Sequence, residues 1–143
     1  MTAKEYLQEI RRLRNRCDNL RRQHDELWEQ ALAIGAIRYD KDKIQVSPEN
    51  QLEKQVLRLF KLREKYLRAV ARYQAEIVKR EAEVARLENW EYEQVLRLRY
   101  FQFLQFSEIA GEMRMSESHV KRLHGAALRV FAKVNKIGND DTK

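Results

Sequence analysis

The amino-acid sequence predicts an all-α protein: a long antiparallel helical hairpin with coiled-coil character, followed by a C-terminal helix-turn-helix domain. The 143 residues include only four glycines and one proline, too few turn-forming residues for a many-stranded sheet. Helix-favouring types such as Leu, Arg, Glu, Lys, Gln and Ala dominate the composition. Heptad stripes cover the first two thirds of the chain, and aromatic residues concentrate in the last third, which places the hairpin first.

The first predicted helix carries one continuous heptad stripe. Apolar or small side chains, with one histidine among them, recur at alternating spacings of four and three. The stripe consists of Tyr6, Ile10, Leu13, Cys17, Leu20, His24, Leu27, Ala31 and Ile34. The positions between them are heavily charged, as expected for a helix that is covered on one narrow face. We expect this helix to end near Gly35, because glycine readily adopts the left-handed conformation found at helix C-termini.

The second predicted helix begins at Ser47-Pro48, after an exposed connecting loop. Serine is a good N-cap, and proline fits the first helical position, where its missing N–H is not needed. The heptad stripe then resumes, interrupted by two arginines. Its members are Leu52, Val56, Leu59, Arg63, Tyr66, Val70, Tyr73, Ile77, Arg80, Val84 and Leu87.

These patterns divide the chain into three parts. Residues 1–90 are predicted to form the helical hairpin or an oligomerisation stalk, with its loop at about residues 35–47. Residues 91–137 are predicted to form the helix-turn-helix domain, and residues 138–143 a disordered tail. A two-helix hairpin buries little apolar surface, so we expect a homodimer or higher homo-oligomer. The pattern leaves open whether the stripes pair within one chain or between chains.

The C-terminal block predicts three shorter helices. The first spans about Glu91 to Phe103, and the second spans Ser107 to Met113. A break follows, and Ser116 is the expected N-cap of the third helix. The expected inward side chains are Tyr92, Val95, Leu96, Phe103, Ile109, Ala110, Met113, Val120, Leu123, Ala127, Val130, Phe131 and Val134. A short helix, a tight turn and a longer helix form the helix-turn-helix arrangement.

The outer face of the third helix is the candidate binding surface. A helix seated in the major groove of DNA must present donors to phosphates and base edges. Between residues 114 and 136 there are six Lys or Arg residues against one acidic residue, and the whole chain has a net charge of +7. We therefore predict double-stranded DNA as the partner of helix 116–134; a merely solvated basic face is the alternative. The candidate DNA-binding residues are Ser116, Glu117, Ser118, His119, Lys121, Arg122, Gly125 and Arg129.

The same block resembles region four of bacterial sigma factors. The similar runs are Tyr92-Glu93-Gln94-Val95-Leu96-Arg97-Leu98-Arg99-Tyr100, Ser107-Glu108-Ile109-Ala110, Met115-Ser116-Glu117-Ser118-His119-Val120-Lys121-Arg122 and Ala127-Leu128. With its Lys4-Glu5-Tyr6-Leu7 start and long helices, the whole chain is similar to small phage and prophage proteins of Gram-positive bacteria related to the ArpU-type late-gene regulators. The resemblance implies sequence-specific binding of promoter DNA and control of transcription, and RNA polymerase is a further candidate partner.

Three features depart from the sigma pattern. That module usually holds glycine where Arg114 stands, and an arginine at positive φ costs about 1 kcal/mol. A Ser or Thr often caps the short helix where Gln105 stands. The first recognition turn is usually richer in arginine than Glu117-Ser118-His119, so the base preference does not carry over. No upstream segment resembles the polymerase-binding or promoter-melting regions, so we do not expect a complete sigma factor.

Other function classes receive less support. There is no glycine-rich phosphate loop, nucleophile–base signature or metal-ligand spacing, so we expect no enzyme activity, no cofactor and no metal. His119 and His124 are five residues apart and should point to different sides of one helix. Without an apolar run for a signal peptide or bilayer span, we expect a cytoplasmic protein of a bacterial host cell with no membrane partner.

Two alternative functions remain open. The first is a DNA-packaging recognition subunit similar to small terminase proteins, which also join a helix-turn-helix to long helices. The second is a coiled-coil protein-interaction module that contacts RNA polymerase. Ring-sized oligomers would favour the packaging subunit, and undetectable DNA binding at low salt would favour the interaction module.

Overall fold

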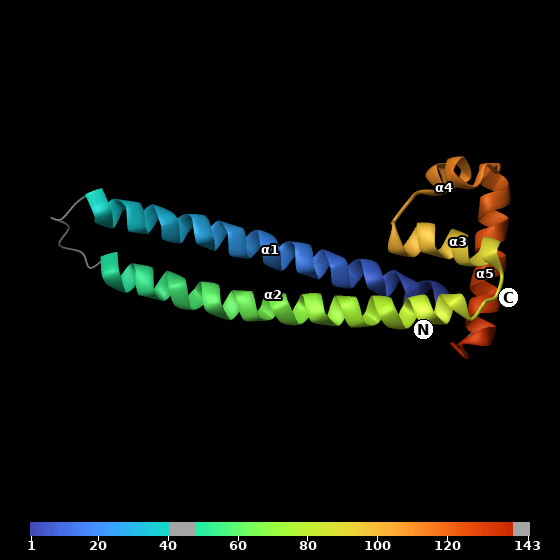
Figure 1. Ribbon diagram of the computed structural model, residues 1–143, viewed down its shortest axis with the longest axis horizontal. Helices are drawn as coiled ribbons and strands as arrows, with labels where there is room; N and C mark the ends of the chain where they lie inside the picture. The colour runs from blue at the N-terminus through green and yellow to red at the C-terminus, as the bar shows by residue number, and fades with distance from the viewer. Residues whose placement is uncertain (41–47, 139–143) are drawn as a thin grey trace. The chain divides into compact units, whose positions relative to one another are not determined.

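The computed structural model describes residues 1–40 and 48–138, and every regular element in these two ranges is helical (Figure 1). The elements are α1 (Ala3–Asp40), α2 (Pro48–Ala85), α3 (Trp90–Leu96), the π-helical turn η1 (Arg97–Phe101), α4 (Phe106–Met113) and α5 (Glu117–Val134). Two long helices thus precede the helix-turn-helix formed by α4 and α5. This order confirms the predicted all-α fold class.

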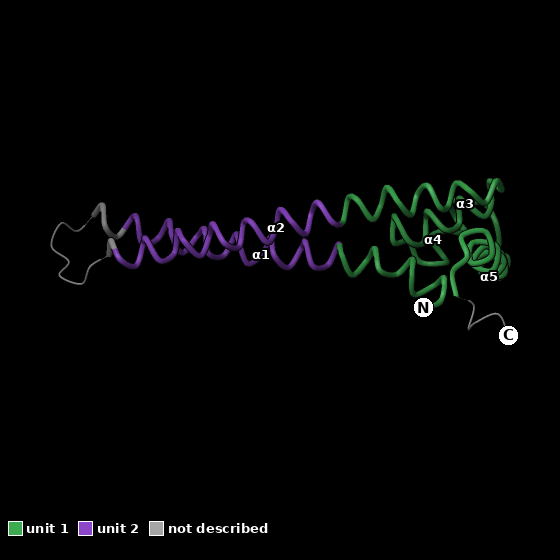
Figure 2. The backbone as a smooth tube through the Cα atoms, turned by 90° about the horizontal axis from the view of Figure 1, so that it is seen from below, with its two compact units in different colours: residues 1–13, 73–143 green, residues 14–72 purple. Residues whose placement is uncertain are grey.

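The chain separates into two compact units (Figure 2). Unit 1 combines Met1–Leu13 with Tyr73–Lys143, and unit 2 is the segment Arg14–Arg72. Each long helix therefore contributes one end to unit 1 and the remainder to unit 2. Unit 1 is larger than the helix-turn-helix segment predicted at residues 91–137, because it also takes in the first turns of α1 and the last turns of α2.

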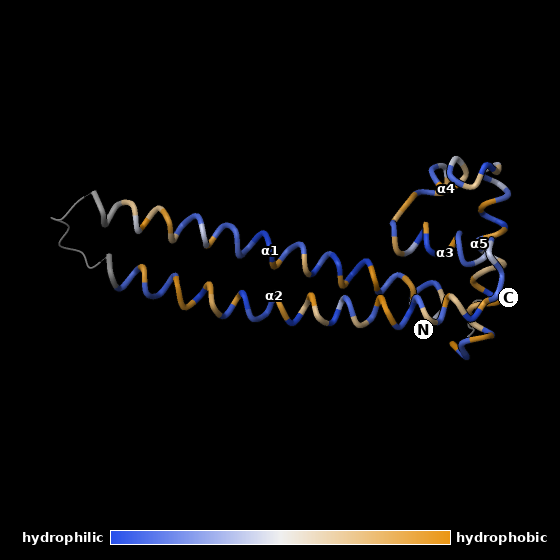
Figure 3. The backbone as a smooth tube through the Cα atoms, viewed as in Figure 1, coloured by the Kyte–Doolittle hydropathy of each residue, from blue (hydrophilic) through white to orange (hydrophobic). Residues whose placement is uncertain are grey.

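In unit 2, segments of α1 and α2 run antiparallel beside each other (Figures 1 and 2). Hydrophobic positions recur among hydrophilic ones along both helices (Figure 3). The buried side chains of this unit include Cys17, Leu20, Ala31, Leu59 and Ala69. All but Ala69 belong to the heptad stripes that the sequence shows. The antiparallel pairing explains this burial, because each helix covers one narrow face of the other.

The predicted end of the first helix at Gly35 is wrong. Helix α1 continues to Asp40, with Gly35 in its interior. A single glycine costs a helix only about 1 kcal/mol relative to alanine, which does not end a helix that is supported on both sides. Helix α2 begins at Pro48, as predicted. Residues 41–47, with the predicted Ser47 cap and most of the loop, lie outside the described residues, as does the predicted tail beyond Gly138.

Unit 1 has one continuous apolar core that joins the ends of the long helices to the helix-turn-helix. Leu7 of α1, Val84 of α2, Val95 of α3 and Phe131 of α5 are all fully buried in it. The predicted inward residues are part of this cluster or pack against it, except for the partly buried Phe103 and the exposed Val134. Because the core needs side chains from four helices, the helix-turn-helix and the base of the hairpin stabilise each other.

Polar contacts around Tyr6 and Arg80 fix the base of the hairpin. The Tyr6 hydroxyl donates to Glu83 Oε1 at 2.5 Å, and burial together with this bond raises the pKa of Tyr6 to about 12. Arg80, which interrupts the heptad stripe, is only 4% exposed. It donates from Nε to the Tyr6 carbonyl at 3.0 Å, pairs with Glu76 and lies 4.1 Å from the Tyr6 ring centre. The desolvation cost of the buried guanidinium is therefore offset by a carbonyl group, a carboxylate and an aromatic ring.

The C-terminal end of α5 is tied to α2 through Asn135. The Asn135 amide nitrogen donates to the Glu83 carbonyl at 3.1 Å. Its side-chain oxygen accepts a hydrogen bond from Arg86 Nη1 at 3.1 Å. These bonds hold the C-terminal end of α5, the end opposite its first turn.

Candidate nucleic-acid interface

The first helix of the C-terminal block ends earlier than predicted. Instead of continuing to Phe103, α3 ends at Leu96 and passes into the wider turn η1. Phe103 then adopts the left-handed conformation with φ of 60°. Leu98 and Tyr100 are both buried, although residues two apart point in nearly opposite directions on a regular α-helix. The π-turn accommodates both side chains, so packing requirements changed the helix that the local sequence predicts.

Helix α4 starts from Gln105, which occupies the capping position where the sigma pattern often has Ser or Thr. The Gln105 backbone N–H donates to Glu108 Oε1 at 3.0 Å, a contact in which the helix's own glutamate reaches back to its start. Helix α4 begins at Phe106, one residue before the predicted Ser107. Its Ile109 is fully buried, which anchors the helix in the core of unit 1.

The turn between α4 and α5 contains one residue in the left-handed backbone conformation. Arg114 is left-handed, with φ of 56° and ψ of 47°, where the sigma pattern usually has glycine. The Met115 N–H donates to the Ala110 carbonyl at 3.0 Å and closes the end of α4. Ser116 caps α5, as predicted, because its Oγ accepts a hydrogen bond from the His119 N–H at 3.1 Å.

We expect Arg114→Gly to stabilise unit 1 by less than about 1 kcal/mol, because glycine removes the Cβ strain of a left-handed residue. The net gain is smaller than the strain, since glycine also raises the entropy of the unfolded chain. The difference in the free energy of unfolding is measured by urea titration, with circular dichroism as the signal. The matched control is Glu112→Gly, two residues earlier and exposed inside α4, which should lose about 1 kcal/mol instead. Equal losses for both variants would contradict the strain argument.

Helix α5 has one buried and one exposed face. Val120, His124, Ala127 and Phe131 are buried at helical spacings. All predicted DNA-binding residues lie outside this buried face: Ser116, Glu117, Ser118, His119, Lys121, Arg122 and Arg129 are exposed, and Gly125 is partly exposed. The structure thus brings them together on the first turn of α5 and on one stripe that follows it.

The exposed stripe is chemically suited to an anionic partner. Lys121 Nζ lies 3.5 Å from Glu117 Oε1, but both side chains are more than half exposed, so this ion pair is weak. Among the side chains that the structure describes, those of residues 1–36 and 50–138, neither Arg122 nor Arg129 has an acidic partner. A Cβ atom added to Gly125 would lie 3.6 Å from Arg129 Nη1, so the guanidinium of Arg129 extends along the helix over Gly125. Both arginines are available to bind phosphate oxygens or base edges.

Two residues behind the recognition helix were not singled out by the sequence pattern. Arg99 donates from Nη1 to the Leu104 carbonyl at 3.0 Å and lies 4.2 Å from the ring centre of Phe106. Tyr100 and His124 share a buried hydrogen bond of 2.7 Å between hydroxyl and Nε2. Only the concentration of aromatic residues near position 100 signalled this cluster. It connects η1 and α4 to α5, and its Tyr100 and His124 side chains are buried.

The two histidines of α5 point to different sides, as predicted. His119 is exposed in the first turn, whereas His124 is 8% exposed in the core. Burial, together with the positive charges of Arg99 and Lys4, lowers the pKa of His124 to about 4. Among the described residues there is no group of three His, Cys, Asp or Glu side chains arranged around a common metal position. Within the same ranges, no helix is long and apolar enough to cross a bilayer.

The comparisons with known proteins agree with this geometry. The family model described as sigma-70, region 4 matches residues 91–130, which contain α3, η1, α4 and most of α5. Searches of curated proteins and of solved structures found no match to the chain. The C-terminal domain is therefore a helix-turn-helix like that of sigma region 4, and the match supports a DNA-binding regulatory role. It covers less than a third of the chain.

Proposed function

We propose that this protein is a sequence-specific transcriptional regulator of the phage and prophage type, related to the ArpU-type late-gene regulators. It binds promoter DNA through helix 116–134 and acts by binding rather than by catalysis, in the cytoplasm of a bacterial host cell. The observation that carries this proposal is the exposed basic stripe of α5, which begins within the segment that matches sigma region 4. The opposite face of the same helix is fixed in the core, so the stripe is held rigidly.

The residues of α5 take different roles in this proposal. A recognition helix enters the major groove with its N-terminal residues toward the bases, so Ser118, His119 and Arg122 reach base edges. Lys121 and Arg129 bind phosphates on the flanks of the groove. Gly125 allows the duplex to approach the helix backbone closely. The shorter α4 crosses the DNA backbone, as the first helix of this motif does in its known complexes.

The regulator acts as a homodimer or higher homo-oligomer, with the long helices forming a coiled coil that sets the distance between two recognition helices. Two-fold related recognition helices bind two half-sites about one helical turn of DNA apart, or a multiple of that distance. RNA polymerase is a further partner in this proposal. The resemblance to sigma region 4 supports such a contact, because the matched domain is part of a polymerase subunit.

The first test is the affinity of Arg122→Ala for DNA fragments from the region around the gene, measured by fluorescence anisotropy at two salt concentrations. If Arg122 binds a base, affinity for the selected fragment should fall by about 1–3 kcal/mol, or roughly 5- to 150-fold. The control, Arg72→Ala, removes the same charge from an exposed position of α2 and should leave selective binding nearly unchanged. Helical content must be equal in all three proteins.

Other outcomes point to the two alternative functions. A large closed oligomer in light scattering, with DNA bound regardless of promoter content, would favour the packaging subunit. No DNA complex at low salt would remove the regulator and leave a protein-interaction module, because electrostatic binding is strongest there. Unchanged affinity of Arg122→Ala for a fragment that the wild type selects would exclude Arg122 from the site and redirect attention to the first turn.

A further inference from the structure

Among the described side chains of unit 2, five large apolar ones are exposed. On α1, Trp28 is 53% and Leu32 56% exposed; on α2, Leu57 is 59%, Phe60 60% and Leu67 57% exposed. Single exposed apolar residues are common on protein surfaces. A group of five on two adjacent helices is not, and contiguous apolar patches of this kind mark interaction sites.

The five side chains lie on the same side of the hairpin. Each directly follows a residue of the inner heptad stripe, as Trp28 follows Leu27 and Phe60 follows Leu59. One residue further along a helix means a rotation of about 100°. Because α1 and α2 run antiparallel, the two rotations have opposite sense when both helices are viewed from one end. The two exposed stripes therefore emerge on one common side, which we call the apolar side.

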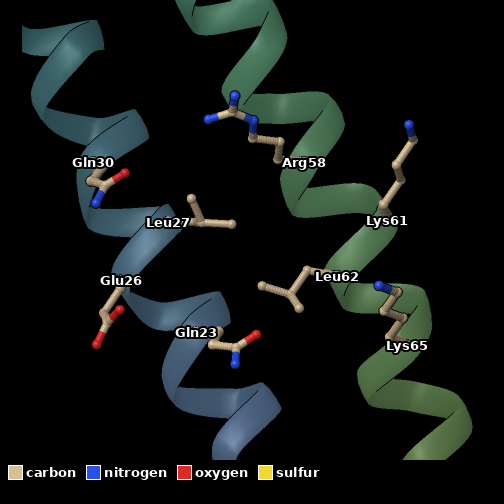
Figure 4. A pocket seen from close by; sticks show the side chains of 8 residues that line it. All are labelled: Gln23, Glu26, Leu27, Gln30, Arg58, Lys61, Leu62 and Lys65. Carbon is tan, nitrogen blue, oxygen red and sulfur yellow. The ribbon is translucent and has the colours of Figure 1, made fainter.

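The other side of the hairpin is polar. There a pocket of about 340 Å³ separates the helices, with Leu27 and Leu62 pointing toward each other at its base (Figure 4). Its polar lining consists of Gln23, Glu26, Gln30, Arg58, Lys61 and Lys65. Each of these residues except Lys61 directly precedes a residue of the inner stripe, so the same geometry places it opposite the apolar side. Lys61 precedes Leu62, which is the neighbour of a stripe residue and also lines the pocket. Unit 2 is thus amphipathic as a whole, with one polar side and one side on which apolar side chains are exposed to solvent.

The core of unit 2 is thin for its length. Among its described residues, five apolar side chains are buried, and two of these are alanines and one is a cysteine. Two helices alone rarely bury enough apolar surface to be stable. A half-exposed aromatic or leucine side chain offers roughly 100 Å², so the apolar side offers about 500 Å² in each copy. Two copies would bury about 1,000 Å², the lower limit for a specific interface.

We propose that the apolar side, formed by Trp28, Leu32, Leu57, Phe60 and Leu67, is the surface on which a second copy of this chain docks. The same patch on both copies makes a two-fold interface, and two stacked hairpins form a four-helix arrangement with a common core. Glu64 lies between Phe60 and Leu67 on the stripe, but its carboxylate is paired with Arg68 at 3.3 Å on the same helix. Its charge is thus already balanced before docking.

This inference rests on the self-association included in the proposed function and does not depend on DNA binding. It assigns the dimer contact to residues of unit 2, none of which belongs to the basic stripe of α5. The experiment below contains no DNA. A failure of dimerisation and a failure of DNA recognition are therefore distinguishable.

The test is sedimentation of the full-length chain over a wide range of concentrations. Wild type should form dimers, and Phe60→Glu should weaken dimerisation by at least about 30-fold, the effect of losing a central hot-spot residue. The matched control is Lys61→Glu, the adjacent residue on the polar side, which should dimerise as wild type does. Leu57→Gln, a milder change, tests the same face if Phe60→Glu loses helical content.

Tryptophan fluorescence gives a second readout. With Trp90→Phe as background, Trp28 is the remaining tryptophan, and its emission should shift to the blue as dimers form. The shift should be absent when Phe60→Glu is added. A wild type that stays monomeric at every concentration would overturn the proposal and assign the face to another protein. Dimers that persist unchanged in Phe60→Glu and Leu57→Gln would overturn it as well, since the interface would lie elsewhere.

Discussion

Replacing Phe131 by alanine is expected to lower the free energy of unfolding of unit 1 by about 3–5 kcal/mol. Phe131 is the largest of the fully buried side chains. Its removal loses the transfer free energy of the ring and leaves a cavity that the neighbouring helices fill only partly. Since small domains are stable by about 5–15 kcal/mol, this single change removes a large part of the total.

The loss should affect the whole unit in one transition. The Phe131 ring centre lies 6.1 Å from that of Tyr6, at the start of α1. It shares its core with Val84 of α2 and Val95 of α3. A cavity at this position therefore weakens the helix-turn-helix and the base of the hairpin together. Urea unfolding should show a lower midpoint for unit 1 with little change in the steepness of the transition.

The matched control is Val134→Ala, one turn further along α5. Val134 is 40% exposed, so its truncation should cost less than about 1 kcal/mol. If Phe131→Ala cost no more than this control, the ring would not be part of the core. If the helix-turn-helix unfolded while the base of the hairpin stayed intact, unit 1 would not be a single cooperative body.

The burial pattern along the hairpin could be predicted from the sequence. The stripe that contains Ile10, Leu13 and Leu20 is buried because a repeat of three and four residues keeps one face toward a partner helix. Leu7 lies outside this stripe and is nevertheless fully buried. The first turns of α1 have a second neighbour, the C-terminal core, which no heptad pattern reveals.

Local backbone features were predictable only where a single residue determines them. The Ser116 cap follows from one side chain and one N–H, and the sequence identifies it without knowledge of the fold. The π-turn η1 has no such signal. It arises because Leu98 and Tyr100 both pack into the core, which is a property of the tertiary structure. The predicted helix end at Gly35 was wrong for a related reason. The weak preference of glycine for ending a helix was outweighed by the residues on both sides of it, which continue the helix.

The exposure of the candidate site follows from helical periodicity once one face is known to be buried. With Val120, Ala127 and Phe131 inside, Arg122 and Arg129 must lie outside. The position of the Arg129 guanidinium over Gly125 depends on a side-chain rotamer, which the sequence does not specify. Which bases these groups contact depends on the DNA partner, so the eight site residues remain a prediction.

Acidification is expected to destabilise unit 1 through His124. Burial lowers the pKa of His124 from 6.5 to about 4, so the unfolded chain binds a proton more readily than the folded protein does. The stabilising contribution of the neutral ring is complete above about pH 7 and decreases as the pH falls through this window. The loss should reach about 3 kcal/mol near pH 4, at 1.36 kcal/mol for each unit of pKa difference.

The groups that face His124 explain why protonation is unfavourable. Tyr100 stacks on the imidazole and hydrogen-bonds to Nε2, and burial raises the pKa of the phenol, so the hydroxyl keeps its proton and donates it. Phe106 meets the ring edge-on at 5.0 Å. Arg99 and Lys4 add positive charge, and none of these groups offers an anion to an imidazolium. A proton on Nε2 would therefore remove the acceptor of the Tyr100 hydroxyl proton, because the bond could then run only from Nε2 to the phenol oxygen, and it would place a charge in an apolar site.

The measurement is the free energy of unfolding at several pH values between 7 and 4, compared between wild type and His124→Gln. Glutamine still offers an acceptor to the Tyr100 hydroxyl but does not titrate, so the difference between the two proteins isolates the histidine from carboxylates that also titrate. We expect wild type to lose about 3 kcal/mol more than the variant over this range. If the free energies of unfolding of the two proteins changed in parallel with pH, the folded protein would tolerate a charged His124. The buried Tyr100–His124 pair would then have to separate at little cost in free energy.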